Sequence, residues 1–449
     1  MKSLNSIPEL RALTAPTSVV RIPYQQQVPL TDRVRRLIDA SPLQRLRNIK
    51  QLGLVSLVYP GATHSRFEHC LGAYHNSLLF LRQLALDDAF ANTVDDHAAE
   101  SLIAAALLHD VGHWPFCHPI EDMGLVDVPR HESLCRERLE NSNLSHLLQT
   151  DWGLTAKSVA DLIDGTAPDH TGRILSSILS GPIDVDKMDY LQRDSLHAGV
   201  PYGMHFDSQR LIASVCLNAQ DGKLALTEKG RTAAELMVFA RYVMFSEVYW
   251  HHAVRSATAM LQRAFFELHE APKADRFWNM HDVEWVEAIS HAAESAKCSP
   301  AKSLLESLFG PQRRLYKRLG QFAHFDDQAI YDKLARRPYS WLVACGHRLA
   351  DIIRHEAGVK LSSPGVLIDA PPMGLEVQFN IQVRDSRDFS FRPLADLSPV
   401  VRVLATHQFD DYVKRVRVFI EPTCDEVTAL QPHLRKWLET AIEDTESTL

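Results

Sequence analysis

An apolar run from Leu102 to Leu108 ends abruptly in the polar pair His109-Asp110. Apolar residues on nearly every side of this run predict a helix buried in the core. Nothing in a core requires an adjacent imidazole and carboxylate, and burying the two groups unpaired is costly. Neutral histidine and ionised aspartate are ligands for a divalent cation, and a bound cation removes that cost. By itself the pair is only a weak indication of a metal site.

Two further residues complete a possible ligand set. His69 lies at the start of a predicted helix, and Asp186 follows a Gly-Pro break on another. With His109-Asp110 they form a mixed set of two imidazoles and two carboxylates, which suits Mn, Fe, Zn or Mg. Such a set leaves positions open for a water and a phosphate oxygen. The chemistry indicated is metal-assisted attack of water on a phosphate.

Acid-base groups and cations cluster around this set in the sequence. His113 follows His109 by four residues, about one helical turn, so both side chains can point the same way. The pair His131-Glu132 and the nearby Glu121 offer an imidazole beside a carboxylate, which suits general acid-base catalysis. Cations that suit phosphates stand near the proposed ligands: Arg66, Lys187 and Arg193.

Taken one at a time, these residues have plainer interpretations. The chain has 22 histidines, so some must cluster by chance. A single histidine such as His69 or His131 is more often a surface or satisfied core residue than a ligand. Asp184, Asp186 and Asp189 also fit a solvated helix face. The residue types alone leave a metal site and an ordinary polar surface as open alternatives.

The composition is that of an ordinary globular protein, with 45% hydrophobic and 23% charged residues in 449. A net charge of -8 argues against broad nucleic-acid binding, although a local basic groove would allow it. The cysteines are scattered singly without a Cys-x-x-Cys pair, so neither a disulfide framework nor a cysteine-based zinc site is indicated. We expect a cytoplasmic location, no secretory signal and no membrane-spanning helix, since no apolar run approaches roughly 18 residues.

The hydrophobic pattern is mostly helical. Residues 1–30, with several prolines and short β-branched runs, predict an extended segment with a hairpin or edge strands. Helices are predicted within residues 31–38, 43–50, 95–110, 131–139, 232–268 and 424–445, with helical patterns through 274–357. The motif at 63–69 is predicted to lead into a further long helix through Leu84. Alternation of apolar and polar residues at 376–383 and 415–420, and a short run at 224–227, predict strands. The sequence therefore predicts a mostly α fold with a small α+β C-terminal lobe.

The motifs occur along the chain in a distinctive order. They are Gln44 to Gly53, Tyr59 to Gly72, His109 to His118, His131-Glu132, and Ile183 to Asp194. This combination strongly resembles the HD-domain phosphohydrolases, and among them the SAM-and-HD-domain deoxynucleotide triphosphohydrolases and their bacterial relatives. The resemblance is dense over residues 18 to about 260 and fainter to about 420, with no sign of a SAM domain. It implies an extended lead-in at 1–30, an HD-domain helical core at 31–270, a helical extension at 271–359 and the α+β lobe at 360–449.

The resemblance also implies a role for each matching residue. The metal ligands are His69, His109, Asp110 and Asp186, and the catalytic histidine is His131, supported by His113 and Glu121. The triphosphate is held by Arg66, Lys187, Tyr190 and Arg241. The sugar and the α-phosphate are contacted by Gln51, Leu52, His118, Asp194 and Tyr249. Among these, Tyr249 packs under the deoxyribose and excludes a 2′-hydroxyl.

The implied reaction is attack of water at the α-phosphorus of a dNTP, which releases a deoxynucleoside and intact triphosphate. A divalent metal supplies the Lewis acid, and the histidine donates a proton to the leaving 5′-oxygen. Asp39, Gln44 and Arg47 match a regulatory site that reads guanine, which implies activation by GTP or dGTP and a homodimer or homotetramer. Trp250 departs from the family pattern, where a glutamine often stands, and either narrows the pocket or turns out of it.

Two other functions remain open. An HD site could serve a nucleotide phosphatase or phosphodiesterase that acts on another nucleotide, since one fold hosts many reactions. The chain could also be a nucleotide-binding or nucleic-acid-binding regulator with weak catalysis. Arg66, Lys187, Tyr190 and Asp194 favour a triphosphate substrate. The acidic net charge disfavours nucleic acid unless assembly creates a basic groove.

Overall fold

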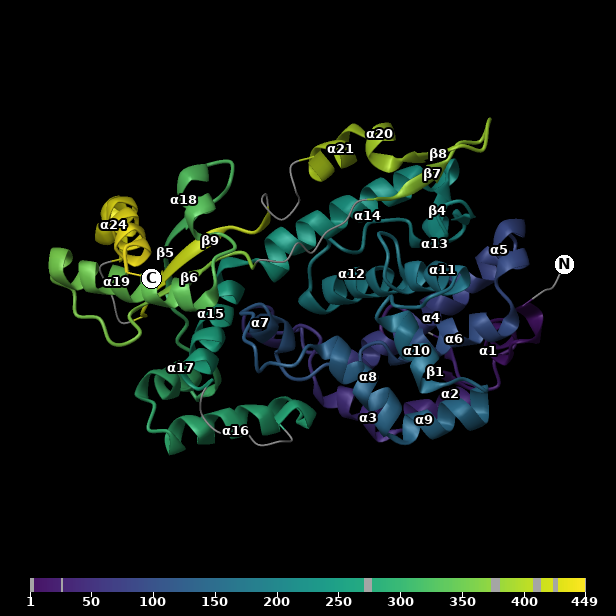
Figure 1. The fold of residues 1–449 in the computed structure, drawn as a ribbon, viewed down its shortest axis with the longest axis horizontal. Helices are drawn as coiled ribbons and strands as arrows, with labels where there is room; N and C mark the ends of the chain where they lie inside the picture. The colour runs from purple at the N-terminus through teal and green to yellow at the C-terminus, as the bar shows by residue number, and fades with distance from the viewer. Residues whose placement is uncertain are drawn as a thin grey trace.

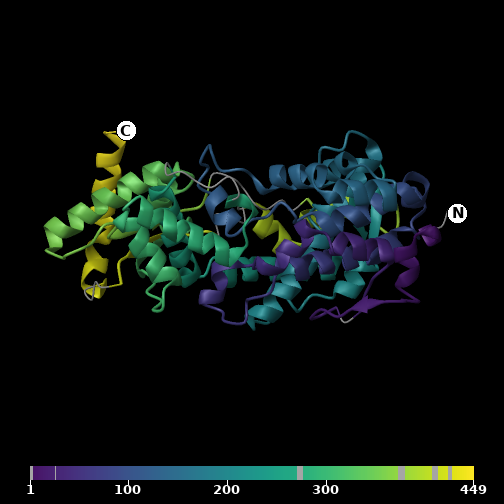
Figure 2. The same ribbon diagram turned by 90° about the horizontal axis from the view of Figure 1, so that it is seen from below.

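The computed structural model describes residues 4–25, 27–269, 277–372, 380–406, 413–422 and 427–448. The molecule is elongated, with a helical core around the N-terminus at one end and a second lobe around the C-terminus at the other (Figures 1 and 2). Helices predominate and the sheets are small, which confirms the predicted fold class. Within the described residues, no helix is both long enough and apolar enough to cross a membrane.

The core is built around α6 (Asp96–Leu108), which begins at the capping side chain of Asp95. Every residue from Leu102 to Leu108 is fully buried, as the apolar run predicts. Around α6 pack α4 (Arg66–Leu84), α10 (Ala156–Ile163) and α11 (His170–Leu179). The remaining core helices are α2 (Asp32–Ile38), α3 (Ser41–Arg45), α5 (Asp88–Thr93), α7 (Cys117–Glu121), α8 (His131–Asn141), α9 (Asn143–Leu147), α12 (Val185–Ala198), α13 (Ser208–Ile212), α14 (Arg231–Met244) and α15 (His252–Glu267).

Helix α12 packs closely on α4, and together they carry several of the predicted site residues. Asp184 caps α12 by accepting a hydrogen bond from the amide of Lys187. Gly72 on α4 permits the close approach, because a Cβ there would lie 1.8 Å from Oδ1 of Asp189 on α12. The long pattern at 232–268 divides into α14 and α15, separated by a π-helical turn at Phe245–Tyr249.

A four-stranded sheet lies on the core and brings distant parts of the chain together. Its order is β3 (Val215–Asn218), β4 (Lys223–Thr227), β7 (Gln382–Arg384) and β8 (Phe391–Pro393), with β7 parallel to β4. After β8, α20 (Leu394–Leu397) and α21 (Pro399–Thr406) follow, and α21 packs on α14 (Figure 1). Residues 380–406 thus pack on the helical core. The predicted strand at 376–383 lies partly outside the described residues, since description resumes at 380.

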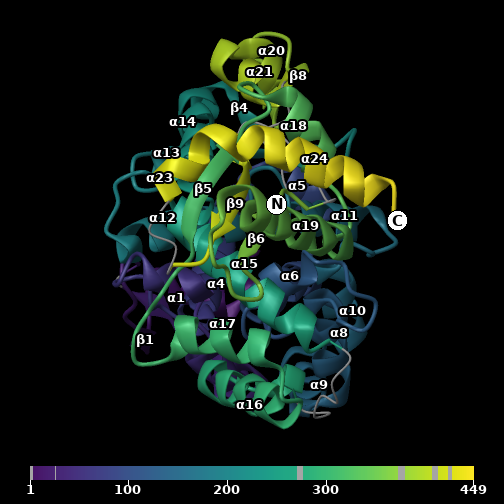
Figure 3. The ribbon, with the colours of Figure 1, turned by 90° about the vertical axis from the view of Figure 1, so that its left-hand side faces the viewer.

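The second lobe contains a three-stranded antiparallel sheet in the order β5 (Lys317–Phe322), β9 (Val416–Ile420), β6 (Val366–Asp369). Figure 3 views this lobe end-on, with α19 (Tyr339–Ala357) and α24 (Leu434–Glu446) packed together beside the sheet. The lobe also holds α18 (Gln328–Leu334) and α23 (Val427–Leu430), while α16 (Asp282–Ser295) and α17 (Ser299–Phe309) pack beside α15 (Figure 1). Strand β5 falls in the stretch predicted to be helical, because pairing with β9 outweighs its local pattern.

The N-terminal segment contains the expected hairpin, in which β1 (Val19–Val20) pairs antiparallel with β2 (Val28–Pro29). A short helix that was not predicted, α1 (Pro8–Ala12), precedes it and begins with a proline in its first turn. Elements on both sides of residue 360 build each of the two larger sheets.

Candidate active site

The four predicted metal ligands converge at one point, although they come from three parts of the core. His69 lies on α4, His109 and Asp110 directly follow α6, and Asp186 lies in the first turn of α12. Nε2 of His69 is 2.9 Å from Oδ1 of Asp186 and 3.2 Å from Nε2 of His109. Nε2 of His109 is 3.3 Å from Oδ1 of Asp110. The structure therefore gathers all four side chains.

The hydrogen bonds around the two histidines fix which nitrogen faces this point. Nδ1 of His69 donates to Asp189 at 2.8 Å, and Nδ1 of His109 donates to the carbonyl of Ala106 at 3.0 Å. When both rings are neutral, their Nε2 atoms carry lone pairs that face each other and two carboxylates. Such an arrangement is repulsive without a cation between the groups. The donor set fits a divalent metal ion, and each ring has the outer hydrogen bond typical of a metal ligand.

The charges around the site favour a cation. Burial opposes protonation of His69, but hydrogen bonds to Asp186 and Asp189 outweigh it and raise the pKa of His69 well above its ordinary value. Burial also opposes ionisation of Asp110, but His113, His109 and Arg66 outweigh it and hold the pKa of that carboxyl well below its usual range. The ionised carboxylates of the site therefore attract positive charge.

The sequence did not indicate the role of Asp189, which lies behind the site. Its oxygens contact Nδ1 of His69 at 2.8 Å and Nη2 of Arg193 at 2.7 Å. Arg193 also pairs with Glu68 at 2.6 Å and is fully buried. Arg193 was expected among the phosphate-binding cations, but it instead completes a buried network that orients His69. The spacing of Asp189 and Arg193, four residues apart on a helix, was the available signal.

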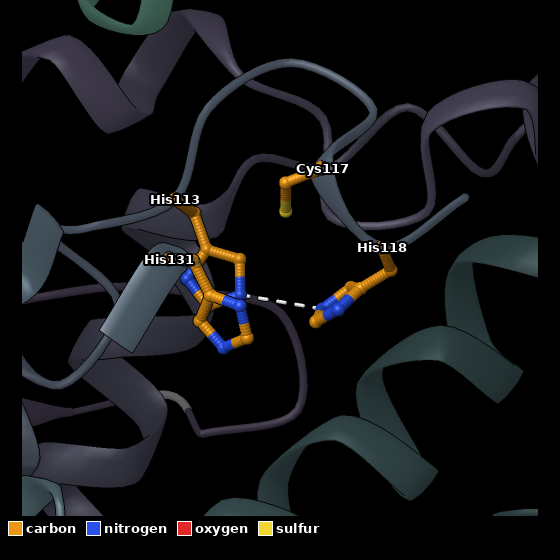
Figure 4. Close-up of side chains that lie close together, drawn as sticks. All are labelled: His113, Cys117, His118 and His131. Atoms are coloured by element: carbon orange, nitrogen blue, oxygen red, sulfur yellow. Dashed lines mark hydrogen bonds between the residues drawn. The ribbon is translucent and has the colours of Figure 1, made fainter. Parts of the chain in front are cut away.

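The predicted acid-base residues form a second group beside the first. Glu121, at the end of α7, accepts hydrogen bonds from the backbone amide and from Nδ1 of His131, at 2.7 and 2.8 Å. Nε2 of His113 lies 3.3 Å from Nε2 of His118, and the rings of His113 and His131 are 4.1 Å apart (Figure 4). Gly112 permits this approach of α8, because a Cβ there would lie 2.0 Å from the carbonyl oxygen of His131.

A cavity of about 650 Å³ opens onto both groups. Its walls include the four predicted metal ligands together with His113 and His131, while Glu121 stands behind His131. The residues predicted to bind substrate also line it: Gln51, Leu52, Arg66, His118, Lys187, Tyr190, Asp194, Arg241 and Tyr249. The structure thus brings every predicted metal-binding, catalytic and substrate-binding side chain to one place; their roles stay predictions.

Several of the cavity residues are held by specific partners. Nη1 of Arg66 pairs with Oδ2 of Asp110 at 2.9 Å, and Nζ of Lys187 pairs with Asp184 at 2.5 Å. The hydroxyl of Tyr249 donates to Oδ2 of Asp194 at 2.6 Å. The other oxygen of Asp194 lies 2.8 Å from Nε2 of a buried histidine, His64, which sequence reasoning did not single out. The surrounding motif Thr63-His64-Ser65 was the only signal.

Trp250 turns away from the large cavity. Its Nε1 donates to the carbonyl of Arg415 at 3.3 Å, and the guanidinium of Arg255 lies 3.9 Å from its ring centre. The side chain is buried and lines a smaller adjoining cavity of about 190 Å³. Gln51, Leu52 and Tyr249 line both cavities, so Trp250 stands beside the predicted substrate residues without lining the large cavity.

The three residues predicted to read guanine lie outside the cavity lining. Asp39 follows α2 and is exposed. The side-chain amide of Gln44 donates to the carbonyl of Ile38 at 2.7 Å, and Nη1 of Arg47 donates to Oε1 of Gln44 at 3.3 Å. The structure brings Gln44 and Arg47 into contact near the end of α2, and their regulatory role stays a prediction.

Comparison with known proteins identifies two matching family models. Residues 66–194 match the HD domain, and residues 206–445 match the HD associated region. An uncharacterized protein of Methanocaldococcus jannaschii is 32% identical over 312 residues, which cover 69% of this chain and 60% of the relative. The deoxynucleoside triphosphate triphosphohydrolase SAMHD1 of Gallus gallus is 27% identical over 370 residues, which cover 72% of this chain and 59% of the relative.

Among solved structures, a hypothetical protein from Aquifex aeolicus superposes with a TM-score of 0.69 at 27% identity. The match covers 94% of this chain and 99% of the other. The chain spans about three fifths of the length of the curated relatives that it matches.

Proposed function

This chain belongs to the HD-domain phosphohydrolases that carry an HD associated region, and on that premise we propose that it hydrolyses a deoxynucleoside triphosphate to deoxynucleoside and inorganic triphosphate. One observation carries the proposal. A single cavity is lined by the four proposed metal ligands, by three cations and by Tyr249, which supports the binding of one nucleotide. The similarity to a deoxynucleoside triphosphate triphosphohydrolase is consistent with it.

The cations of the cavity support a triphosphate substrate. Arg66, Lys187 and Arg241 come from three different helices and all line the cavity, as does the hydroxyl-bearing Tyr190. A triphosphate carries several negative charges, and charge-assisted hydrogen bonds from arginine and lysine are the strongest that a protein offers to phosphate. In this proposal the three cations hold the chain of phosphates while its first phosphorus lies next to the metal ligands.

The tyrosine supports a deoxyribose. The hydrogen bond from Tyr249 to Asp194 fixes the ring in the cavity wall, and Asp194 is itself held by His64. A ring fixed in this way cannot move aside for an added hydroxyl group, so a ribose packed on it would meet a steric clash at its 2′ position. Gln51 and Leu52 line the same cavity and complete the sugar subsite in this proposal.

In this proposal the metal ligands and the acid-base residues have different roles in the reaction. His69, His109, Asp110 and Asp186 would hold Mn²⁺, Mg²⁺, Fe²⁺ or Zn²⁺. A divalent ion in that site supplies Lewis-acid polarisation of the phosphate. His131, oriented by Glu121, donates a proton to the leaving 5′-oxygen, and His113 packs against its ring.

A product assay by mass spectrometry tests the proposal. The purified protein receives each of the four dNTPs with Mn²⁺ or Mg²⁺, beside a His109→Ala variant. Deoxynucleoside and intact triphosphate, formed by the wild type and absent from the variant, are the expected products. Release of monophosphate or of single phosphates would instead assign the site to a phosphatase or phosphodiesterase.

The same assay tests regulation. Asp39, Gln44 and Arg47 are proposed to bind GTP or dGTP in a homodimer or homotetramer, and Gln44 already contacts Arg47. We expect GTP or dGTP to raise the rate in the wild type and to have no effect on Arg47→Ala. Light scattering with and without the nucleotide reports the assembly, and equal activation of both proteins would reject the regulatory role.

A further inference from the structure

Three imidazoles and a thiol form a compact cluster beside the candidate metal site. His113 follows α6, Cys117 and His118 open α7, and His131 opens α8. One ligand atom from each of the four side chains lies within 4.8 Å of all the others. Figure 4 shows the rings of His113 and His131 on the left and the ring of His118 on the right, with the sulfur of Cys117 above the space between them. None of these four residues is among the first set of candidate metal ligands, which are His69, His109, Asp110 and Asp186.

The spacing of two of the four side chains suits a tetrahedral ion. Nε2 of His113 lies 3.3 Å from Nε2 of His118. Two nitrogens that bind one tetrahedral zinc at about 2.0–2.1 Å lie about 3.3 Å apart. The two nitrogen atoms therefore already lie at the separation that a shared zinc ion requires, although His113 follows α6 and His118 lies in α7.

The third histidine, His131, also has the tautomer that can bind a metal. Nδ1 of His131 donates to Oε2 of Glu121 at 2.8 Å, which leaves the lone pair on Nε2. Histidine ligands of metals usually carry such a carboxylate on the other ring nitrogen, because it fixes the tautomer and increases the basicity of the ligand atom. Arg66, which lines the same cavity, pairs with Asp110 at 2.9 Å.

We propose that His113, Cys117, His118 and His131 form a second metal site, selective for zinc, whose occupation inhibits the enzyme. Imidazole nitrogens and a thiolate sulfur are ligands that zinc binds in proteins, whereas Mg²⁺ and Mn²⁺ prefer oxygen ligands. Cys117 is buried and His118 is exposed in the cavity wall, so an ion can enter past His118 and meet the sulfur behind it. Binding breaks the S–H bond of Cys117, releases the proton to solvent and forms a zinc–sulfur bond.

Inhibition follows from the position of His131, and this consequence rests on the proposed function. A zinc ion occupies the lone pair of Nε2, so His131 can no longer carry the proton that the leaving 5′-oxygen needs. The first site stays chemically different, because its four donors are two imidazoles and two carboxylates. Mn²⁺ or Mg²⁺ would therefore act at the first site only, whereas Zn²⁺, which either site can take, would inhibit through the second.

Cobalt spectroscopy tests the site without turnover. Co²⁺ is added to the metal-stripped, full-length protein, and the near-ultraviolet spectrum is followed for the thiolate-to-cobalt charge-transfer band. We expect this band in the wild type and in Cys135→Ser, whose sulfur contacts the carbonyl of His109 outside the cluster. The band should be absent from Cys117→Ser. No band in the wild type, or an unchanged band in Cys117→Ser, would overturn the proposal.

Zinc inhibition is the second test. With Mn²⁺ present, Zn²⁺ should inhibit the wild type and Cys135→Ser alike, and Cys117→Ser should need roughly 10- to 100-fold more zinc. Equal inhibition of all three proteins would also overturn the proposal. The cobalt band does not require a substrate, so a protein that shows the band but hydrolyses no dNTP contradicts the proposed function and leaves the zinc site standing.

Discussion

Asp189 holds the ring of His69 through a 2.8 Å hydrogen bond to Nδ1. This contact directs Nε2 of His69 toward Asp186 and His109. A buried carboxylate that never reaches the cavity thus decides how a candidate metal ligand presents its lone pair.

The first prediction concerns this contact. Asp189→Asn removes the negative charge behind His69, so we expect the affinity for Mn²⁺ to fall roughly 10- to 100-fold. Isothermal titration calorimetry with Mn²⁺ measures the change. Arg193→Lys is the matched control, because it disturbs the ion pair of Asp189 with Arg193 and leaves the contact with His69 in place. Equal metal affinity in the wild type and Asp189→Asn would reject the positioning role.

The second prediction concerns the choice of sugar. Tyr249→Ala removes the ring fixed by Asp194, so we expect the ratio of kcat/KM for a dNTP over the matching NTP to fall by about tenfold or more. Tyr249→Phe keeps the ring but loses the hydrogen bond that fixes it, so its discrimination should lie between those of the wild type and the alanine variant. Steady-state kinetics with dGTP and GTP measure both ratios. A loss of discrimination in the phenylalanine variant as large as in the alanine variant would contradict the steric explanation.

The third prediction concerns stability at low pH. Burial in α4 lowers the pKa of His75 to about 4, with Asp189 opposing the shift and Arg82 adding to it. Since the unfolded chain protonates His75 near pH 6.5, the unfolded state binds the proton first as the pH falls. We expect the free energy of unfolding to drop by about 1–2 kcal/mol between pH 7 and pH 5 because of this residue.

Urea unfolding of the wild type and of His75→Gln at the two pH values measures this contribution. The glutamine variant should lose less stability on acidification, because it carries no group that titrates at that position. His146→Gln replaces an exposed histidine and serves as the control. An identical pH dependence in the wild type and His75→Gln would show that His75 is not the cause.

The fourth prediction concerns Trp250. Its indole packs under Arg255 and donates to the carbonyl of Arg415, so its removal opens a space where the core meets the second lobe. We expect Trp250→Ala to lower the free energy of unfolding by about 3–5 kcal/mol. The relative kcat/KM values among the four dNTPs should change little, because Trp250 does not line the large cavity. A changed base preference in a stably folded Trp250→Phe variant would place the indole near the substrate instead.

Most of the residues that line the large cavity were named through the family resemblance, while interrupted patterns by themselves pointed only to a few of them. His109-Asp110 ends an otherwise apolar helix, and Asp186 follows a helix-breaking Gly-Pro pair. Asp189 and His64 were missed as functional residues because they act through His69 and Asp194, and such contacts exist only after α4 and α12 pack together. Strand β5 was missed for a similar reason, since its partner β9 lies far along the chain.

The parallel pairing of β7 with β4 also bears on how the protein folds during synthesis. Leu226 on β4 pairs with Val383 on β7, and α21 then packs on α14 of the core. During synthesis, the residues of the helical core and much of the second lobe therefore leave the ribosome before β7 has been made. Strand β7 is the one that pairs with β4. Until then β4 presents an open edge, which is the kind of surface that other chains can pair with. The four-stranded sheet of the core is therefore complete only after residues 382–393 have been synthesised.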